Sequence, residues 1–125
     1  TSNLYELIVS SINEFKLDID IKPKLQRNEI LDLYNHSTAL IYPSLFESYG
    51  LPLVEAGHYK LPVLASELDY VRDILDPVET FDPKSAKSIA RSVKRFLKIK
   101  DKYCIVIISN QGWNCYLYLY STLFK

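Results

Sequence analysis

The chain has 125 residues, enough for one modest domain but too few for an enzyme that closes two domains over its substrate. Fifteen Lys and Arg residues cancel fifteen Asp and Glu residues, and 48% of the residues are hydrophobic. This composition argues against intrinsic disorder. The pI near 6.6 argues against a nucleic-acid binder that works through bulk positive charge.

Periodic apolar residues predict helices and strands that alternate along the chain. A first helix carries an apolar stripe at helical spacing, formed by Leu4, Leu7, Ile8, Ile12 and Phe15. The next elements are, in chain order, a strand over Leu17–Ile21, a helix over Asn28–His36, a strand over Ala39–Tyr42, a helix over Pro52–Tyr59, a strand over Pro62–Ala65 and a helix over Leu68–Leu75. Asp82 is then expected to cap a long helix over residues 83–100, with Pro83 at its first position.

This alternation predicts the fold class. Strands and helices at this spacing imply right-handed crossovers and a parallel sheet covered by helices on both faces. We therefore expect an α/β, Rossmann-like domain over residues 1–102. No GxGxxG motif is present, which argues against an ordinary dinucleotide site. His36 and His58 lack partners at metal-ligand spacing, so no metal site is expected.

Charges are segregated along the chain. Residues 47–82 carry eight acids against two bases, and residues 84–102 carry eight bases against one acid. The basic face of the 83–100 helix is either simply solvated or a contact for an anionic membrane surface.

Residues 103–125 form an apolar tail that is uncharged up to Phe124. Polar residues near position 112 interrupt it, so we expect a strand, a turn and a helical last segment, continuous with the domain, rather than a membrane span. Cys104 and Cys115 lie eleven residues apart and are expected to be reduced thiols of a cytoplasmic protein, with a disulfide as the alternative.

One segment, residues 43–56, follows a buried strand and opens a helix, and therefore lies at the carboxyl end of the sheet. Gly50 and Pro52 separate two carboxylates, so Glu47 lies in the loop and Glu55 in the first turns of the helix. The amides near this helix start can bind an anion such as phosphate, and an acid one turn further can accept hydrogen bonds from ribose hydroxyls. From spacing alone, an ordinary strand-to-helix turn with surface acids is the favoured reading, and a binding site is the alternative.

The same segment resembles the donor-binding core of retaining glycosyltransferases of family 4, a group 1 family with the two-domain GT-B fold. Glu47 and Glu55, separated by seven residues, lie in the frame P-S-x-x-E-x-x-G-x-P-x-x-E-A, which a P-V-x-A-S sequence follows. The resemblance covers roughly residues 4–100 and implies the C-terminal, donor-binding half of a GT-B fold, which is incomplete here.

The resemblance also implies roles for these residues. Glu55 would bind the ribose of a UDP- or GDP-sugar, and Glu47 would act in catalysis beside the hydroxyls of the donor sugar. The amides of Ser48, Tyr49, Gly50 and Leu51 would hold the diphosphate or the sugar. A hexose would be transferred by front-side displacement with retention, and the departing phosphate would take the acceptor's proton without a metal or other cofactor.

The chain departs from the whole enzyme in two respects. The Arg and Lys that the family brings to the diphosphate map onto no residue here, and the N-terminal acceptor domain is missing. We therefore expect donor binding with little turnover. The protein is expected in the cytoplasm, with the inner membrane face as the alternative, and to serve a polysaccharide or lipid-linked acceptor. The alternative is a non-catalytic Rossmann-like module that self-associates through residues 103–125.

Overall fold

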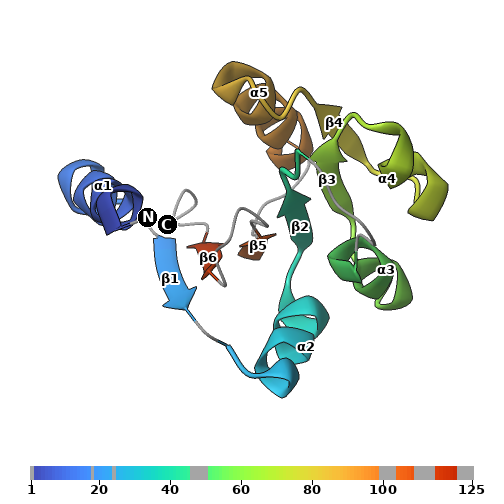
Figure 1. Cartoon of the computed structure of the whole chain (residues 1–125), viewed down its shortest axis with the longest axis horizontal. Helices are drawn as coiled ribbons and strands as arrows, with labels where there is room; N and C mark the ends of the chain where they lie inside the picture. The colour runs from blue at the N-terminus through green and yellow to red at the C-terminus, as the bar shows by residue number, and fades with distance from the viewer. Residues whose placement is uncertain are drawn as a thin grey trace.

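The computed structural model describes residues 2–17, 19–23, 25–45, 51–98, 104–108 and 115–120. Helices and strands alternate over most of these ranges (Figure 1). In chain order they are α1 (Ser2–Phe15), β1 (Ile19–Pro23), α2 (Arg27–His36), β2 (Ala39–Tyr42), α3 (Leu51–His58), β3 (Val63–Ser66), α4 (Asp69–Ile74), β4 (Glu79–Phe81), α5 (Ala86–Leu97), β5 (Cys104–Ile108) and β6 (Cys115–Tyr120).

The strands of the described chain form one six-stranded sheet in the order β1-β6-β5-β2-β3-β4. Strand β2 runs parallel to both β5 and β3, and β3 runs parallel to β4. Strand β6 is antiparallel to its two neighbours, β1 and β5. The parallel half of the sheet confirms the expected α/β, Rossmann-like architecture.

Helices cover both faces of the parallel strands. Successive side chains of a strand point to opposite faces of the sheet, so each strand contributes to two buried clusters. Leu40 and Tyr42 of β2 are fully buried in a cluster with residues of α2, α3 and α4. Ala39 and Ile41, which alternate with them along the strand, pack instead with Phe96 of α5. In Figure 1, α5 accordingly lies apart from α2 and α3. Every residue of β2 and β3 is buried, as expected for a parallel strand covered twice.

The tail differs from its predicted structure. A strand was expected first and β5 confirms it, but the helix predicted for the last apolar segment is wrong over Cys115–Tyr120, which form β6. The alternation of Tyr and Leu in β6 has the period and the residue types of a strand rather than a helix. Among the described residues, no helix is both long and apolar enough to pass through a bilayer.

The pairing register also decides between the two readings of the cysteines. Cys104 lies opposite Tyr120 on β6, whereas Cys115, at the other end of β6, lies opposite Pro23 on β1. A disulfide requires Cα atoms within about 7 Å, and five residues of extended strand span roughly 16 Å. The register therefore excludes a bond between these two cysteines.

Helix α5 begins later than predicted. Ser85, not Asp82, is its N-cap, because the Ser85 Oγ accepts a hydrogen bond from the Ser88 amide at 3.1 Å. The Asp82 carboxylate instead accepts from the Lys84 amide at 2.9 Å and closes the turn that contains Pro83. The sequence offers two capping residues within four positions, Asp82 and Ser85, and Ser85 caps the helix.

The apolar stripe of α1 is only partly covered. Leu7 and Phe15 are 61% and 65% exposed, although they occur at the spacing of a buried face. In Figure 1 this helix lies beside β1 and away from the helices that cover β2 and β3. Helical spacing predicts the helix itself, but it carries no information on what packs against its apolar side.

Candidate functional site

The parallel strands end at one edge of the sheet, and the connections that follow them build the candidate site. Ligands of open α/β sheets bind at this edge. Ser44, just after β2, is buried, and its carbonyl accepts a 2.6 Å hydrogen bond from the Ser66 hydroxyl at the end of β3. The first residues of the β2–α3 connection are therefore anchored to the neighbouring strand.

A cavity of about 620 Å³ opens at the same edge. Its lining residues come directly after three successive parallel strands: Leu45 after β2, Glu67 and Leu68 after β3, and Asp82, Pro83 and Lys84 after β4. The volume falls within the range of small-molecule sites. Leu45 belongs to the segment 43–56 that the sequence predicts as the site, whereas the other lining residues were not predicted as site residues. The signal available was their position just past a buried strand.

Glu67 on the rim of this cavity is held as a carboxylate. The Arg72 guanidinium donates to both of its oxygens, from Nη2 to Oε1 at 2.9 Å and from Nε to Oε2 at 3.0 Å. These hydrogen bonds lower the pKa of Glu67 below its ordinary value and raise the pKa of Arg72. Both groups are exposed, so the pair contributes local charge rather than much stability.

The predicted site residues fall into two groups. Glu47, Ser48, Tyr49 and Gly50 lie outside the described residues, so their roles stay predictions. Leu51 is the first residue of α3 and is exposed. The backbone amides of this first helical turn have no intrahelical acceptor, which leaves them available to an anion.

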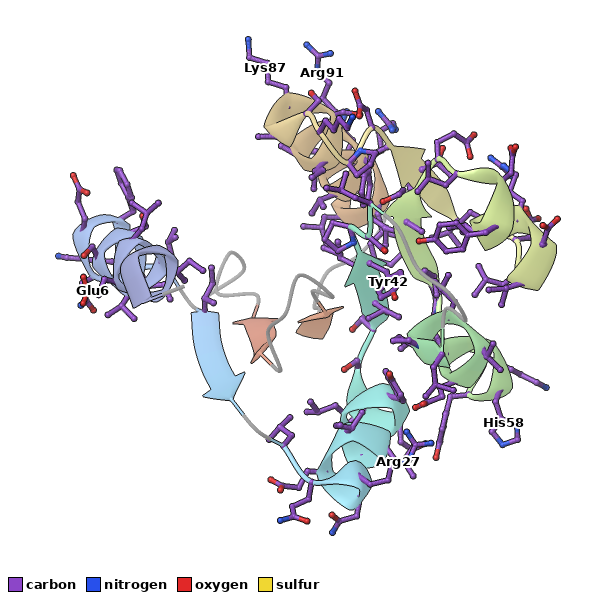
Figure 2. The ribbon with its side chains drawn as sticks, in the orientation of Figure 1. Glu6, Arg27, Tyr42, His58, Lys87 and Arg91 are labelled. Carbon is purple, nitrogen blue, oxygen red and sulfur yellow. The ribbon has the colours of Figure 1, made fainter. Side chains whose placement is uncertain are left out.

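Glu55 lies in the second turn of α3, as predicted, and its side chain is only 10% exposed. Its Oε1 accepts a hydrogen bond of 2.7 Å from Nη1 of Arg27, the first residue of α2. Its Oε2 is buried and has no hydrogen-bond partner within the described part of the chain. In Figure 2 the Arg27 side chain lies between α2 and α3. A buried carboxylate oxygen without a donor is costly and points to a missing partner.

Arg27 was not predicted as a site residue. The bond to Glu55, first in effect, and the negative charge of that carboxylate raise the pKa of Arg27 above its already high value. The sequence did contain one signal for a role of Arg27. A cation at the first position of a helix interacts unfavourably with the helix dipole, which suggests that another contact holds it there. Such a residue is favoured there only when an acid lies nearby, and the acid is 28 residues away in the sequence.

Packing between α2 and α3 fixes the two ends of this ion pair. Tyr34 of α2 is buried, and its ring centroid lies 6.0 Å from that of Tyr59, just after α3. Leu53 and Ala56 of α3 are fully buried against the sheet on either side of Glu55 in the sequence. The part of α3 that carries Glu55 is therefore packed against β2 and β3. Among the described residues, no group of three or more His, Cys, Asp or Glu side chains is placed to hold a metal.

Comparison with known proteins shows the family of the chain. Residues 8–111 match the model of the family described as glycosyl transferases group 1. The chain belongs to the group 1 glycosyltransferase family. Within this family, the match includes the whole parallel part of the sheet, the cavity and the Arg27–Glu55 pair.

Two bacterial relatives are similar to this group 1 glycosyltransferase chain. It is 27% identical to the O-antigen chain mannosyltransferase RfbU of Salmonella typhimurium, over 80% of this chain and 33% of that protein. It is 31% identical to a serotype-specific mannosyltransferase WbdA of Escherichia coli, over 67% of this chain and 10% of that protein. The chain thus spans a third or less of the length of these relatives. No solved structure matches it.

Proposed function

We propose that this chain binds the nucleoside diphosphate sugar of a retaining glycosyl-transfer reaction. The observation that carries the proposal is Glu55 of α3, a mostly buried carboxylate with one oxygen that has no partner among the described residues. Ribose hydroxyls can donate hydrogen bonds to such an oxygen. Because the carboxylate is already mostly buried by folding, ligand binding removes little more water from it. The relatives are named mannosyltransferases, so we propose mannose as the hexose and UDP or GDP as the carrier.

The direction of α3 suggests where the diphosphate and the sugar of the donor bind. The N-terminus of this helix carries partial positive charge, which supports binding of the diphosphate at Leu51 and at the amides that the sequence assigns to it, those of Ser48, Tyr49 and Gly50. Glu47, one residue before this group, is then placed at the hydroxyls of the sugar. Amides fixed before the reaction stabilise the leaving diphosphate without a metal and without reorganisation.

The proposed reaction exchanges one bond at the anomeric carbon for another. The bond from the anomeric carbon to the diphosphate oxygen breaks, and the acceptor oxygen bonds to the same face of the sugar. The acceptor's proton passes to the departing diphosphate oxygen, so charge and atoms balance. The acceptor, a growing polysaccharide or a lipid-linked saccharide at the cytoplasmic membrane face, is assigned to a part of the enzyme that this chain does not contain. We expect the chain alone to bind donor but to turn over poorly.

Calorimetric titration with UDP, GDP and their sugars tests the proposal. We expect saturable binding of one nucleoside diphosphate, weaker binding of its monophosphate, and no response to the free sugar. The diphosphate supplies the charge that the α3 terminus stabilises, and the free sugar lacks both recognised groups. No saturable response to any of these nucleotides would contradict the proposal.

The alternative is a non-catalytic module that self-associates through residues 103–125. This fold removes one simple way for it to do so, the pairing of strand edges between two copies. β5 and β6 are interior strands with neighbours on both sides, so their backbone edges are already used within the chain. β1 and β4 form the edges of the described sheet instead. Concentration-dependent oligomerisation without nucleotide binding would favour this alternative over donor binding.

We also propose that α5 contacts an anionic membrane surface, as suits a lipid-linked acceptor. An exposed basic stripe is defined as Lys87, Arg91 and Lys94 of α5, spaced four and three residues apart, with Lys84 before the helix and Lys98 after it. The described residues place no ion pair on any of these five cations, whereas Arg95, on another side, pairs with Glu79. Lys87 and Arg91 extend away from the protein in Figure 2.

The membrane proposal predicts binding to vesicles that contain phosphatidylserine and none to phosphatidylcholine vesicles at low salt. Each basic residue near such a surface contributes roughly fivefold in affinity. The triple substitution Lys87→Gln, Arg91→Gln, Lys94→Gln is therefore expected to abolish co-sedimentation, as is high salt. Equal sedimentation of the wild type with both vesicle types, or with neither, would show that the stripe is only solvated.

A further inference from the structure

Among the carboxylate–guanidinium pairs of the described chain, the Arg27–Glu55 pair differs in the state of its second carboxylate oxygen. Arg72 bonds both oxygens of Glu67, which is half exposed. Arg27 bonds one oxygen of Glu55, and the second oxygen is buried without a donor among the described residues. A pair that served stability alone would satisfy both oxygens or leave the second in water.

We infer that Arg27 is a positioning residue for Glu55 in donor binding. By fixing Oε1, the guanidinium selects one rotation of the carboxylate and holds Oε2 ready for a ribose hydroxyl. The inference rests on the proposed function, because it assigns a cause to the orientation of the group that binds the ribose. Arg27 itself touches no part of the donor in this assignment.

The placement of Arg27 suits this task. Its backbone is part of α2, whose first turn is closed by a 3.1 Å hydrogen bond from the Gln26 amide to Glu29 Oε1. The contact between Tyr34 and Tyr59 fixes α2 against the end of α3. The cation is thus held by one helix and the carboxylate by another, so the donor meets a site with its geometry already set. Such preorganisation lowers the ordering cost of binding.

The inference predicts how variants of Arg27 and Glu55 bind a nucleoside diphosphate. The ligand is UDP or GDP, whichever the wild type binds more tightly. Arg27→Ala frees the Glu55 carboxylate to rotate and is expected to weaken binding on the order of tenfold, the worth of a charge-assisted hydrogen bond. Arg27→Lys keeps a single cationic donor and is expected to recover most of the affinity. Because Arg27 acts only through Glu55, the Arg27→Ala, Glu55→Ala double variant should bind no more weakly than Glu55→Ala alone.

Arg95→Ala is the matched control. It breaks the other described pair between an exposed arginine and a partly buried glutamate, Arg95–Glu79, which lies between α5 and β4. We expect it to leave nucleotide affinity unchanged, and both Ala variants should melt at similar temperatures because both arginines are exposed.

The outcomes separate this inference from the proposed function. Weakened binding by Glu55→Ala together with unchanged binding by Arg27→Ala would overturn the positioning role and leave the donor site standing. Equal losses in the Ala and Lys variants of Arg27 would overturn it as well, since the cation would then not be the cause. Unchanged binding by Glu55→Ala would overturn the donor site itself.

Discussion

Glu55→Ala is expected to reduce the affinity of the chain for nucleoside diphosphates by at least about tenfold, while the protein stays folded. The substitution removes the acceptor for the ribose hydroxyls, and a hydrogen bond to a charged group contributes on the order of tenfold or more. Stability should be unchanged or slightly higher, because alanine favours helix and because a buried oxygen with no partner in the described part of the chain disappears. Calorimetry measures the affinity, and thermal unfolding checks the fold.

Glu79→Ala is the control for this prediction. Glu79 is also a partly buried acid paired with an arginine, but it lies in β4, before the ligand-binding edge. Its substitution should leave nucleotide affinity at the wild-type value. Equal losses for Glu55→Ala and Glu79→Ala would trace the effect to general destabilisation rather than to a ribose contact.

Leu53→Ala is expected to lower the free energy of unfolding by about 2–5 kcal/mol, the range for truncating a buried leucine. Leu53 is 0% exposed and joins α3 to the cluster that contains β2 and β3. The cavity left behind cannot close fully, because Tyr42 and Val71 of the same cluster are themselves fully buried. Urea unfolding followed by circular dichroism measures the change.

Val54→Ala, at the next position of α3, is the natural comparison. Val54 is 51% exposed, so its truncation removes little buried surface and should change stability by no more than about 0.5 kcal/mol. Similar losses for the two variants would mean that α3 does not pack on the sheet through Leu53. The expected contrast would instead confirm the face on which Glu55 is anchored.

Local patterns were sufficient for the elements that carry the site. The continuous apolar run of Ala39–Tyr42 and the glycine and proline after it predict a buried strand, a loop and a helix, and β2 and α3 confirm this. Glu55 lies on that helix as expected. Each of these features depends on residues close together in the sequence.

Contacts between distant residues were not predictable in the same way. The partner of Glu55 is Arg27, 28 residues earlier, and no short spacing relates them. A final helix is predicted for the tail although its Tyr and Leu residues alternate, because the strands that pair with this segment, β1 and β5, could not be known. The exposed side of α1 has the same cause, since periodicity reveals an apolar face and not its cover.

The most direct test of the donor site compares a nucleoside diphosphate with its 2′,3′-dideoxy analogue, on the wild-type chain and on Glu55→Ala. If Glu55 accepts hydrogen bonds from the ribose, the wild type should bind the analogue on the order of tenfold more weakly. The variant should bind the two compounds equally, since its acceptor is gone. Equal binding of both compounds by the wild type, or discrimination that survives in Glu55→Ala, would contradict the assignment of Glu55 to the ribose.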